Sequence, residues 1–147
     1  MKNYLRLLMR SVTVVAAWII AWVVYMIAMM MTVYDGLLSL IFQPVMAALT
    51  STVFVGAALL VGLVFRIPFV GKVWAASWWW AASLAATSTL VLCLGSTFGL
   101  TSIYTNPETG SQFTGIHPIA ALASYFLLIF SIANWPLPVK LNRTQQD

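Results

Sequence analysis

Charged side chains are scarce in this chain of 147 residues: Asp, Glu, Lys and Arg make up 7% of it, against about a quarter of an average soluble domain. Hydrophobic residues make up 62%. A soluble fold of this size lacks the interior to hide so much apolar surface, so the composition excludes that class. We expect residues 1–147 to form a single domain embedded in a membrane.

Other shortages exclude other classes of protein. Cys93 is the single cysteine, so the chain cannot form an internal disulfide. His117 is the single histidine, so one chain cannot supply two imidazole ligands to a haem. The net charge of +4 comes without a basic run or alternating basic and aromatic residues, so nucleic acid is not an expected partner.

Long apolar stretches are what the sequence does contain. A helix needs about 17–25 such residues to cross a bilayer, and four stretches reach or approach that length without a charged side chain. We therefore expect an all-α membrane protein, a compact bundle of four transmembrane helices. The predicted spans are 11–34, 44–65, 73–95 and 118–135, with an external loop at 96–117.

A cleavable signal peptide is the alternative interpretation of the first stretch, because three cations precede it. The stretch is longer than the roughly 7–15 apolar residues of such a signal. Its end, "YMIAMMMTVYDG", also offers no clear cleavage site flanked by small residues. These features favour an uncleaved span.

The basic residues indicate the orientation of the spans. Four crossings place the N-terminus, the loop 66–72 and the C-terminal tail on one side of the membrane. All seven cations fall on that side, and the other side holds Asp35 and Glu108. Lys and Arg are retained in the cytoplasm, so we predict that both termini are cytoplasmic in a plasma or inner membrane. The cations, which we expect to meet lipid headgroups, are Lys2, Arg6, Arg10, Arg66, Lys72, Lys140 and Arg143.

Small residues recur every four positions in three of the spans. Burial of Leu cannot drive helix association in lipid, so close backbone approach and interhelix hydrogen bonds must do so. The predicted packing residues are Ser77, Ala81, Ala85 and Thr89 in the third span, Ala48, Thr52 and Gly56 in the second, and Ala120 and Ser124 in the fourth. A stripe of this kind could equally mediate an oligomer.

Bulky residues line the first span instead: Trp18, Trp22, Tyr25 and Met29 follow helical spacing. Trp22 falls near the middle of the membrane, where its indole N–H has no water to bind. We expect this N–H to donate to a hydroxyl on a neighbouring helix. The alternative is a ring that faces lipid with an unmet donor.

Catalysis and transport chemistry find little support. No Asp, Glu, His, Lys or Arg lies within a predicted span, which argues against an ion pump acting alone. The segment "GSTFG" at 95–99 has Thr97 where a nucleophile elbow needs serine. His117, Asp35 and Glu108 have suitable types for metal ligation, but no spacing motif joins them. We expect no enzyme activity.

Methionine and cysteine side chains are the one feature of the sequence that suggests a cofactor, a bound copper ion. They fall in the outer half of the predicted spans and would suit Cu(I). Methionine is also a common apolar filler, and this is the stronger interpretation, so no cofactor is expected. The sulfur residues are Met26, Met29, Met30, Met31, Met46 and Cys93.

The external loop has the pattern of a short β-hairpin. The segments "TSIYT" and "SQFTG" flank "NPETG", in which Asn106 and Pro107 favour a turn and Gly110 can adopt positive φ. We expect the hairpin to bury Ile103 or Phe113 against the helix ends, the alternative being an exposed loop. Its predicted docking surface consists of Ile103, Tyr104, Phe113 and His117.

Residues 37–42 lie on the same side and are too few to cross a membrane, so we expect them to lie along the interface or to re-enter. With these features, the sequence favours a non-catalytic accessory, assembly or regulatory component that contacts other membrane subunits, itself or lipid. An oligomeric carrier, channel or lipid-handling protein is the alternative, and a cofactor-dependent enzyme ranks third.

Overall fold

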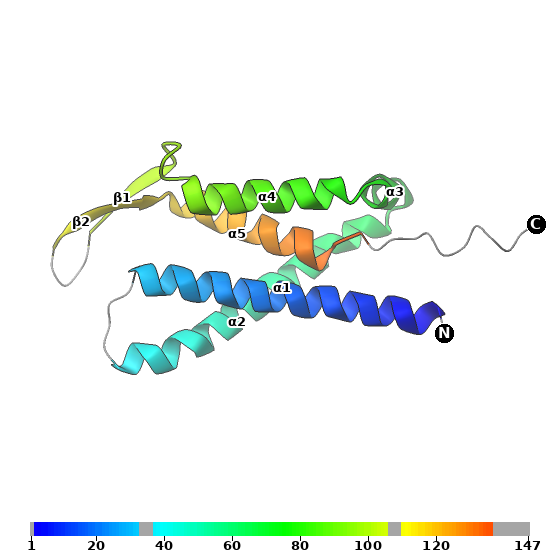
Figure 1. Cartoon of the computed structure of the whole chain (residues 1–147), viewed down its shortest axis with the longest axis horizontal. Helices are drawn as coiled ribbons and strands as arrows, with labels where there is room; N and C mark the ends of the chain where they lie inside the picture. The colour runs from blue at the N-terminus through cyan, green and yellow to red at the C-terminus, as the bar shows by residue number, and fades with distance from the viewer. Residues whose placement is uncertain (1, 33–36, 106–109, 137–147) are drawn as a thin grey trace, which may run out of the picture.

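The structure is a computed structural model that describes residues 2–32, 37–105 and 110–136, and these are mostly helical, with one β-hairpin. Figure 1 shows the elements in chain order. They are the helices α1 (Lys2–Thr32) and α2 (Leu37–Val61), the 3₁₀ turn η1 (Gly62–Arg66), α3 (Pro68–Ala76), α4 (Trp79–Leu94), the strands β1 (Thr101–Thr105) and β2 (Gln112–Ile116), and α5 (Pro118–Ala133).

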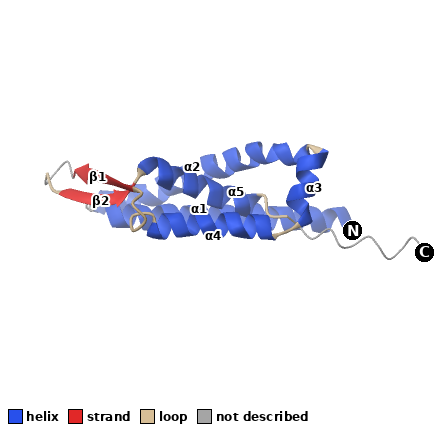
Figure 2. Cartoon of the chain, turned by 90° about the horizontal axis from the view of Figure 1, so that it is seen from above, coloured by secondary structure: helices blue, strands red, loops and turns tan. Residues whose placement is uncertain are grey.

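Helices α1, α2, α4 and α5 run along the length of the molecule (Figure 1). α5 is the central helix, since it packs against α1, α2 and α4. The start of α1, the crosswise α3 and the end of α5 gather at one end of the bundle, which we call the α3 end, and the hairpin projects from the other (Figure 2). The buried hydrophobic core consists of Ala17, Ala21, Val55, Ala58, Tyr125, Ile129 and Ala133.

Two helical segments, Leu7–Met29 and Ile41–Arg66, are long and apolar enough to cross a membrane. The bent pair α3 and α4 would make a third if it counts as one span, and α5 is a shorter apolar helix of 16 residues. The described chain is therefore a helical protein with two to three candidate membrane spans and a small antiparallel sheet.

Helix α2 begins earlier in the sequence than the second predicted span, 44–65. Residues 37–42 are not a separate segment, because α2 begins at Leu37 and runs through Pro44. Pro44 is therefore inside the helix and not in its first turn. A proline removes only the N–H that would serve the carbonyl four residues earlier, and apolar helices tolerate that loss where neighbouring groups compensate.

The third predicted span is also not one continuous helix. α3 and α4 meet at an angle of 76°. Ser77 lies in the break with extended backbone (φ −150°, ψ 126°), and its Oγ accepts a hydrogen bond from the Trp79 N–H at 3.3 Å. Ser77 is therefore not part of a helical stripe with Ala81. Hydropathy depends on composition and not on direction, so it gives no signal for this bend.

The β-hairpin prediction is confirmed. β1 and β2 pair antiparallel, with Ile103 opposite Thr114 and Tyr104 opposite Phe113. Gly110 has φ +68°, a conformation that glycine adopts without steric cost. The predicted turn residues 106–109 lie outside the described residues.

Candidate functional site

The two faces of the hairpin differ in composition. Tyr104 and Phe113 share one face, where their rings stack with centroids 5.5 Å apart. The Tyr104 ring also covers Gly115, since a Cβ at Gly115 would lie 3.0 Å from Tyr104 Cε2. Its hydroxyl donates to the Ile116 carbonyl oxygen at 2.7 Å. Tyr104 therefore braces the hairpin from within, because antiparallel pairs without such side-chain contacts are marginally stable.

The opposite face is open to its surroundings. Ile103 is 71% exposed and lies opposite Thr114, and Thr101, Thr105 and Thr114 around it are exposed as well. Phe113 is 43% exposed. The expectation that Ile103 or Phe113 is buried against the helix ends is therefore wrong.

The hairpin meets the bundle through other residues. Ile116 reaches the end of α4, where a Cβ added to Gly95 would lie 2.8 Å from Ile116 Cδ1. His117 is half-buried at the N-cap of α5, and its backbone N–H donates to the Leu100 carbonyl at 2.8 Å. These contacts fix the direction of the hairpin and leave Ile103 free of the bundle.

Side-chain hydrogen bonds connect α1 to its neighbours. Trp22 Nε1–H donates to the Pro44 carbonyl oxygen at 3.2 Å, and Trp18 Nε1–H donates to Thr52 Oγ1 at 3.1 Å. The prediction that Trp22 bonds to a neighbouring helix is confirmed, but its acceptor is a backbone carbonyl and not a hydroxyl. The Tyr125 hydroxyl on α5 donates to the Ala21 carbonyl at 2.9 Å and links a third helix.

A second group of polar contacts lies at the α3 end. Trp74 Nε1–H donates to the Asn134 carbonyl oxygen at 2.8 Å, and the Trp74 ring stacks on Phe65 with centroids 4.7 Å apart. The Asn134 side-chain amide donates to the Ala58 carbonyl at 3.0 Å and to the Phe130 carbonyl at 3.1 Å. Asn134 thus joins α2, α3 and α5, and the bond to Trp74 holds α3 across the bundle.

The buried face of α2 is one position away from the predicted stripe. Thr52 and Gly56 are exposed and Ala48 is partly buried, and a Cβ at Gly56 would meet nothing within 4 Å. Thr52 still takes part in helix packing through its bond to Trp18. The buried α2 residues are Gln43, Ala47, Ser51, Val55 and Ala58.

The stripes of α4 and α5 agree more closely with the structure. Ala81 is buried and Ala85 partly buried, but Thr89 is exposed and its neighbour Ser88 is buried in its place. On α5, Ser124 is buried and Ala120 partly buried.

The predicted headgroup cations that the structure describes gather at the α3 end. Arg66 at the end of η1 and Lys72 on α3 are exposed, and Arg10 is exposed in the N-terminal third of α1, the helix whose start lies at this end (Figure 2). Lys2 and Arg6 lie in the first turns of α1. Lys140 and Arg143 lie outside the described residues.

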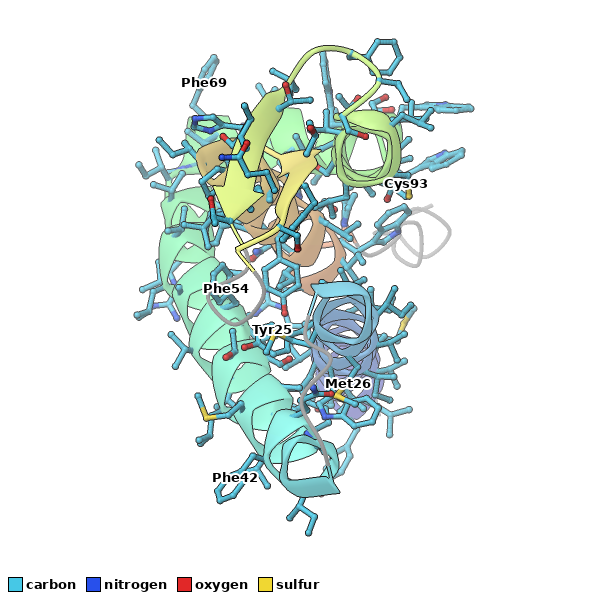
Figure 3. The ribbon with its side chains drawn as sticks, turned by 90° about the vertical axis from the view of Figure 1, so that its left-hand side faces the viewer. Tyr25, Met26, Phe42, Phe54, Phe69 and Cys93 are labelled. Atoms are coloured by element: carbon cyan, nitrogen blue, oxygen red, sulfur yellow. The ribbon has the colours of Figure 1, made fainter. Side chains whose placement is uncertain are left out.

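The sulfur residues do not form one cluster. Met26 extends from α1 and Cys93 is exposed on α4, well apart in Figure 3. Met46 is exposed on α2, and Met29 is partly buried on α1. The described ranges contain no group of three His, Cys, Asp or Glu side chains that could hold a metal ion. Asp35, Glu108 and the side chains of Met30 and Met31 lie outside the described residues.

Sequence analysis missed Asn134, Trp74 and Tyr125 as the residues that fasten the helices. An amide at the end of an apolar run, in "IANWP", was the available signal for Asn134. Comparison with known proteins finds no match: no family model, no curated protein and no solved structure matches this chain.

Proposed function

We propose that this chain is a non-catalytic component of a membrane assembly, which binds another membrane protein through the exposed face of its hairpin. The observation that carries the proposal is Ile103. It is 71% exposed at the centre of β1, in a paired ribbon that projects beyond the helices (Figure 1). A large aliphatic side chain held outward among exposed threonines provides an anchor for a partner at little entropic cost.

We further propose that the chain crosses the bilayer four times with both termini in the cytoplasm. α4 and α5 have 16 residues each, about 24 Å at 1.5 Å per residue. This length is short for a hydrocarbon core of about 30 Å, and local bilayer thinning and flanking aromatic residues accommodate such a mismatch. The exposed cations Arg10, Arg66 and Lys72 share the end opposite the hairpin, which supports a cytoplasmic α3 end.

The interhelix hydrogen bonds support a structural role for the bundle. Trp22, Tyr125 and the Asn134 amide all donate to backbone carbonyls of neighbouring helices. Such bonds fix the relative positions of helices in lipid. The bundle would then be the scaffold that presents the hairpin.

A photo-crosslinking amino acid placed at Ile103 tests the docking surface in cells, with the same group at Leu60 as the control. Leu60 is similarly exposed, at 69%, but lies on α2. We expect a crosslink to one distinct membrane protein from position 103 only, and its loss when Thr114→Lys is added on the same face of the hairpin. Equal adducts from both positions, or none from either, would contradict the proposal.

A carrier or channel built by self-association is the second candidate. α4 packs mainly against α5, and Ser83 and Thr87, one helical turn apart, are exposed on it. Hydroxyls of this kind can line a shared pore in a symmetric oligomer. If the adduct from position 103 is a second copy of this chain, and gentle purification yields a homo-oligomer, this candidate replaces the first.

A further inference from the structure

The backbone hydrogen bonds of the hairpin show which groups of β1 face away from β2. The His117 N–H donates to the Leu100 carbonyl at 2.8 Å, directly beside the pair of Thr101 and Ile116. Hydrogen-bonded and non-bonded pairs alternate along an antiparallel ladder. The pair of Thr101 and Ile116 is therefore a non-bonded one, and so is every second pair after it. The β1 residues whose N–H and C=O groups point outward are Thr101, Ile103 and Thr105.

This outer edge of β1 is unpaired within the described part of the chain. Thr101, Ile103 and Thr105 are all exposed. No hydrogen bond among the described residues reaches the outward N–H and C=O groups of these three residues. Such a row of donors and acceptors, two residues apart, is the template that another extended chain recognises.

The outer edge of β2 differs at its end near the bundle. Ile116 is one of the residues whose backbone groups point outward there, but its carbonyl oxygen already accepts from the Tyr104 hydroxyl at 2.7 Å. The side chain of Ile116 also packs against Gly95 at the end of α4. A strand added to β2 would have to displace the Tyr104 hydroxyl. β1 is therefore the edge that can accept a strand along its whole length.

β1 lacks the features that protect exposed edges. Proteins commonly protect an edge strand with lysine, with proline or with a β-bulge. The sequence of β1 is Thr-Ser-Ile-Tyr-Thr, and it pairs with β2 residue for residue without a bulge. Residues 101–105 and 110–116 contain no charged side chain. The strand that fits this edge is thus uncharged, with an aliphatic or β-branched residue beside Ile103, since such cross-strand pairs are stabilising.

A second copy of this chain in the same membrane does not fit the edge. A two-fold pairing of β1 with itself is antiparallel, with Ile103 opposite Ile103. The hairpin projects from the bundle along its length (Figure 2). Antiparallel pairing would therefore turn the two bundles in opposite directions, whereas copies in one membrane share one orientation.

We infer that the outer edge of β1 binds an extended, uncharged segment of a different protein, which pairs with β1 and makes the sheet three-stranded. The inference rests on the proposed function, because it names the way in which the partner binds the hairpin. Main-chain hydrogen bonds to Thr101, Ile103 and Thr105 supply affinity, and the side chain beside Ile103 supplies specificity.

Proline substitutions test the edge, because proline lacks the N–H that an added strand would bind and is tolerated where a strand N–H points outward. Thr105→Pro removes an outward N–H from β1. Gln112→Pro is the matched control, since Gln112 lies directly opposite Thr105 and its N–H points outward from β2. Each is combined with the photo-crosslinking amino acid at position 103. We expect Thr105→Pro to lower the adduct yield about fivefold, the effect of one lost hydrogen bond, and Gln112→Pro to leave it unchanged.

Amide hydrogen exchange of the full chain verifies that each variant keeps its hairpin. The inward amides of Ser102 and Tyr104, which face β2, should still exchange slowly. If either proline opens the hairpin, Thr101→Pro on β1 and Thr114→Pro on β2 replace the pair, because their N–H groups also point outward.

The outcomes separate this inference from the proposed function. An adduct from position 103 that Thr105→Pro leaves at full yield, or that Gln112→Pro lowers equally, would overturn the strand pairing and leave docking through the hairpin face in place. An adduct with a second copy of this chain would also overturn it. The absence of any adduct from position 103 would contradict both.

Discussion

The indole N–H of Trp22 on α1 donates to the backbone carbonyl oxygen of Pro44 on α2, with 3.2 Å between Nε1 and O. A helical carbonyl has a second lone pair, so it can accept this bond in addition to its own helical partner. One turn earlier on α1, Trp18 bonds to Thr52. The two indoles therefore connect α1 to α2 at two levels, and the Trp22 bond lies at Pro44, where the missing N–H of proline removes one backbone hydrogen bond of α2.

Trp22→Phe should lower the free energy of unfolding by roughly 0.5–1.5 kcal/mol, because it removes a donor that serves an interhelix bond in an apolar environment. Thermal unfolding in detergent, followed by circular dichroism, measures the effect. Trp79→Phe is the matched control, since Trp79 is 62% exposed on α4. Equal melting temperatures for the two variants would show that the bond to Pro44 contributes nothing.

Gly62→Ala should destabilise the protein, and Gly56→Ala should not. A Cβ at Gly62 would overlap Oδ1 of Asn134, whereas a Cβ at Gly56 would meet nothing within 4 Å. In the helical interior Gly56→Ala should even stabilise by about 0.5–1 kcal/mol, because alanine loses less backbone entropy. The same detergent melts compare the two. A shift of the same sign and size for both variants would contradict the contact between Gly62 and Asn134.

A double-mutant cycle tests whether that contact is the cause. Asn134→Ala alone removes the amide bonds to Ala58 and Phe130 and should cost roughly 1–3 kcal/mol. It also removes the atoms that would overlap the new Cβ at Gly62. Adding Gly62→Ala to Asn134→Ala should therefore cost much less than Gly62→Ala alone, with a coupling of about 0.5–3 kcal/mol. Strictly additive effects would mean that Gly62 is intolerant for another reason.

The sequence was sufficient for the features that depend on composition and local turn chemistry. Hydropathy located the long apolar helices, and the paired strands followed from alternating residues around a segment with Asn, Pro and Gly. Pro118 begins α5 in its first turn, as a proline at that position predicts. All these signals lie within the segment that forms the element.

Features that depend on a distant partner were not predictable. The bend at Ser77 goes with a bond between Trp74 and Asn134, which are 60 residues apart. On α2, each position of the predicted stripe is adjacent to a small or β-branched residue, as Thr52 is to Ser51. Periodicity therefore left two faces equally suitable, and the packing of α1 and α5 selects the one with Ser51.

Tyr104→Phe should make the hairpin open more often, because it removes the hydroxyl that donates to the Ile116 carbonyl at 2.7 Å. A loss of about 1 kcal/mol corresponds to roughly fivefold faster amide hydrogen exchange in 101–105 and 112–116. Thr114→Val is the control, since it removes an exposed hydroxyl from the same hairpin. Exchange that is unchanged in Tyr104→Phe, or equally fast in both variants, would show that the hydroxyl does not brace the hairpin.

Cysteine labelling of intact cells distinguishes four crossings from a re-entrant α3–α4 pair. In a Cys93→Ala background, Thr114→Cys reports the hairpin and Lys72→Cys reports the α3 end; both positions are exposed. If α4 crosses the bilayer, a maleimide that cannot enter cells should label Thr114→Cys directly and Lys72→Cys only after permeabilisation. If the pair bent by 76° re-enters instead, the two cysteines lie on the same side and react together.

Arg10→Cys on α1 should behave like Lys72→Cys, because both cations share one end of the bundle. Labelling of Lys72→Cys from outside would remove both the four-span arrangement and the cytoplasmic placement of the α3 end.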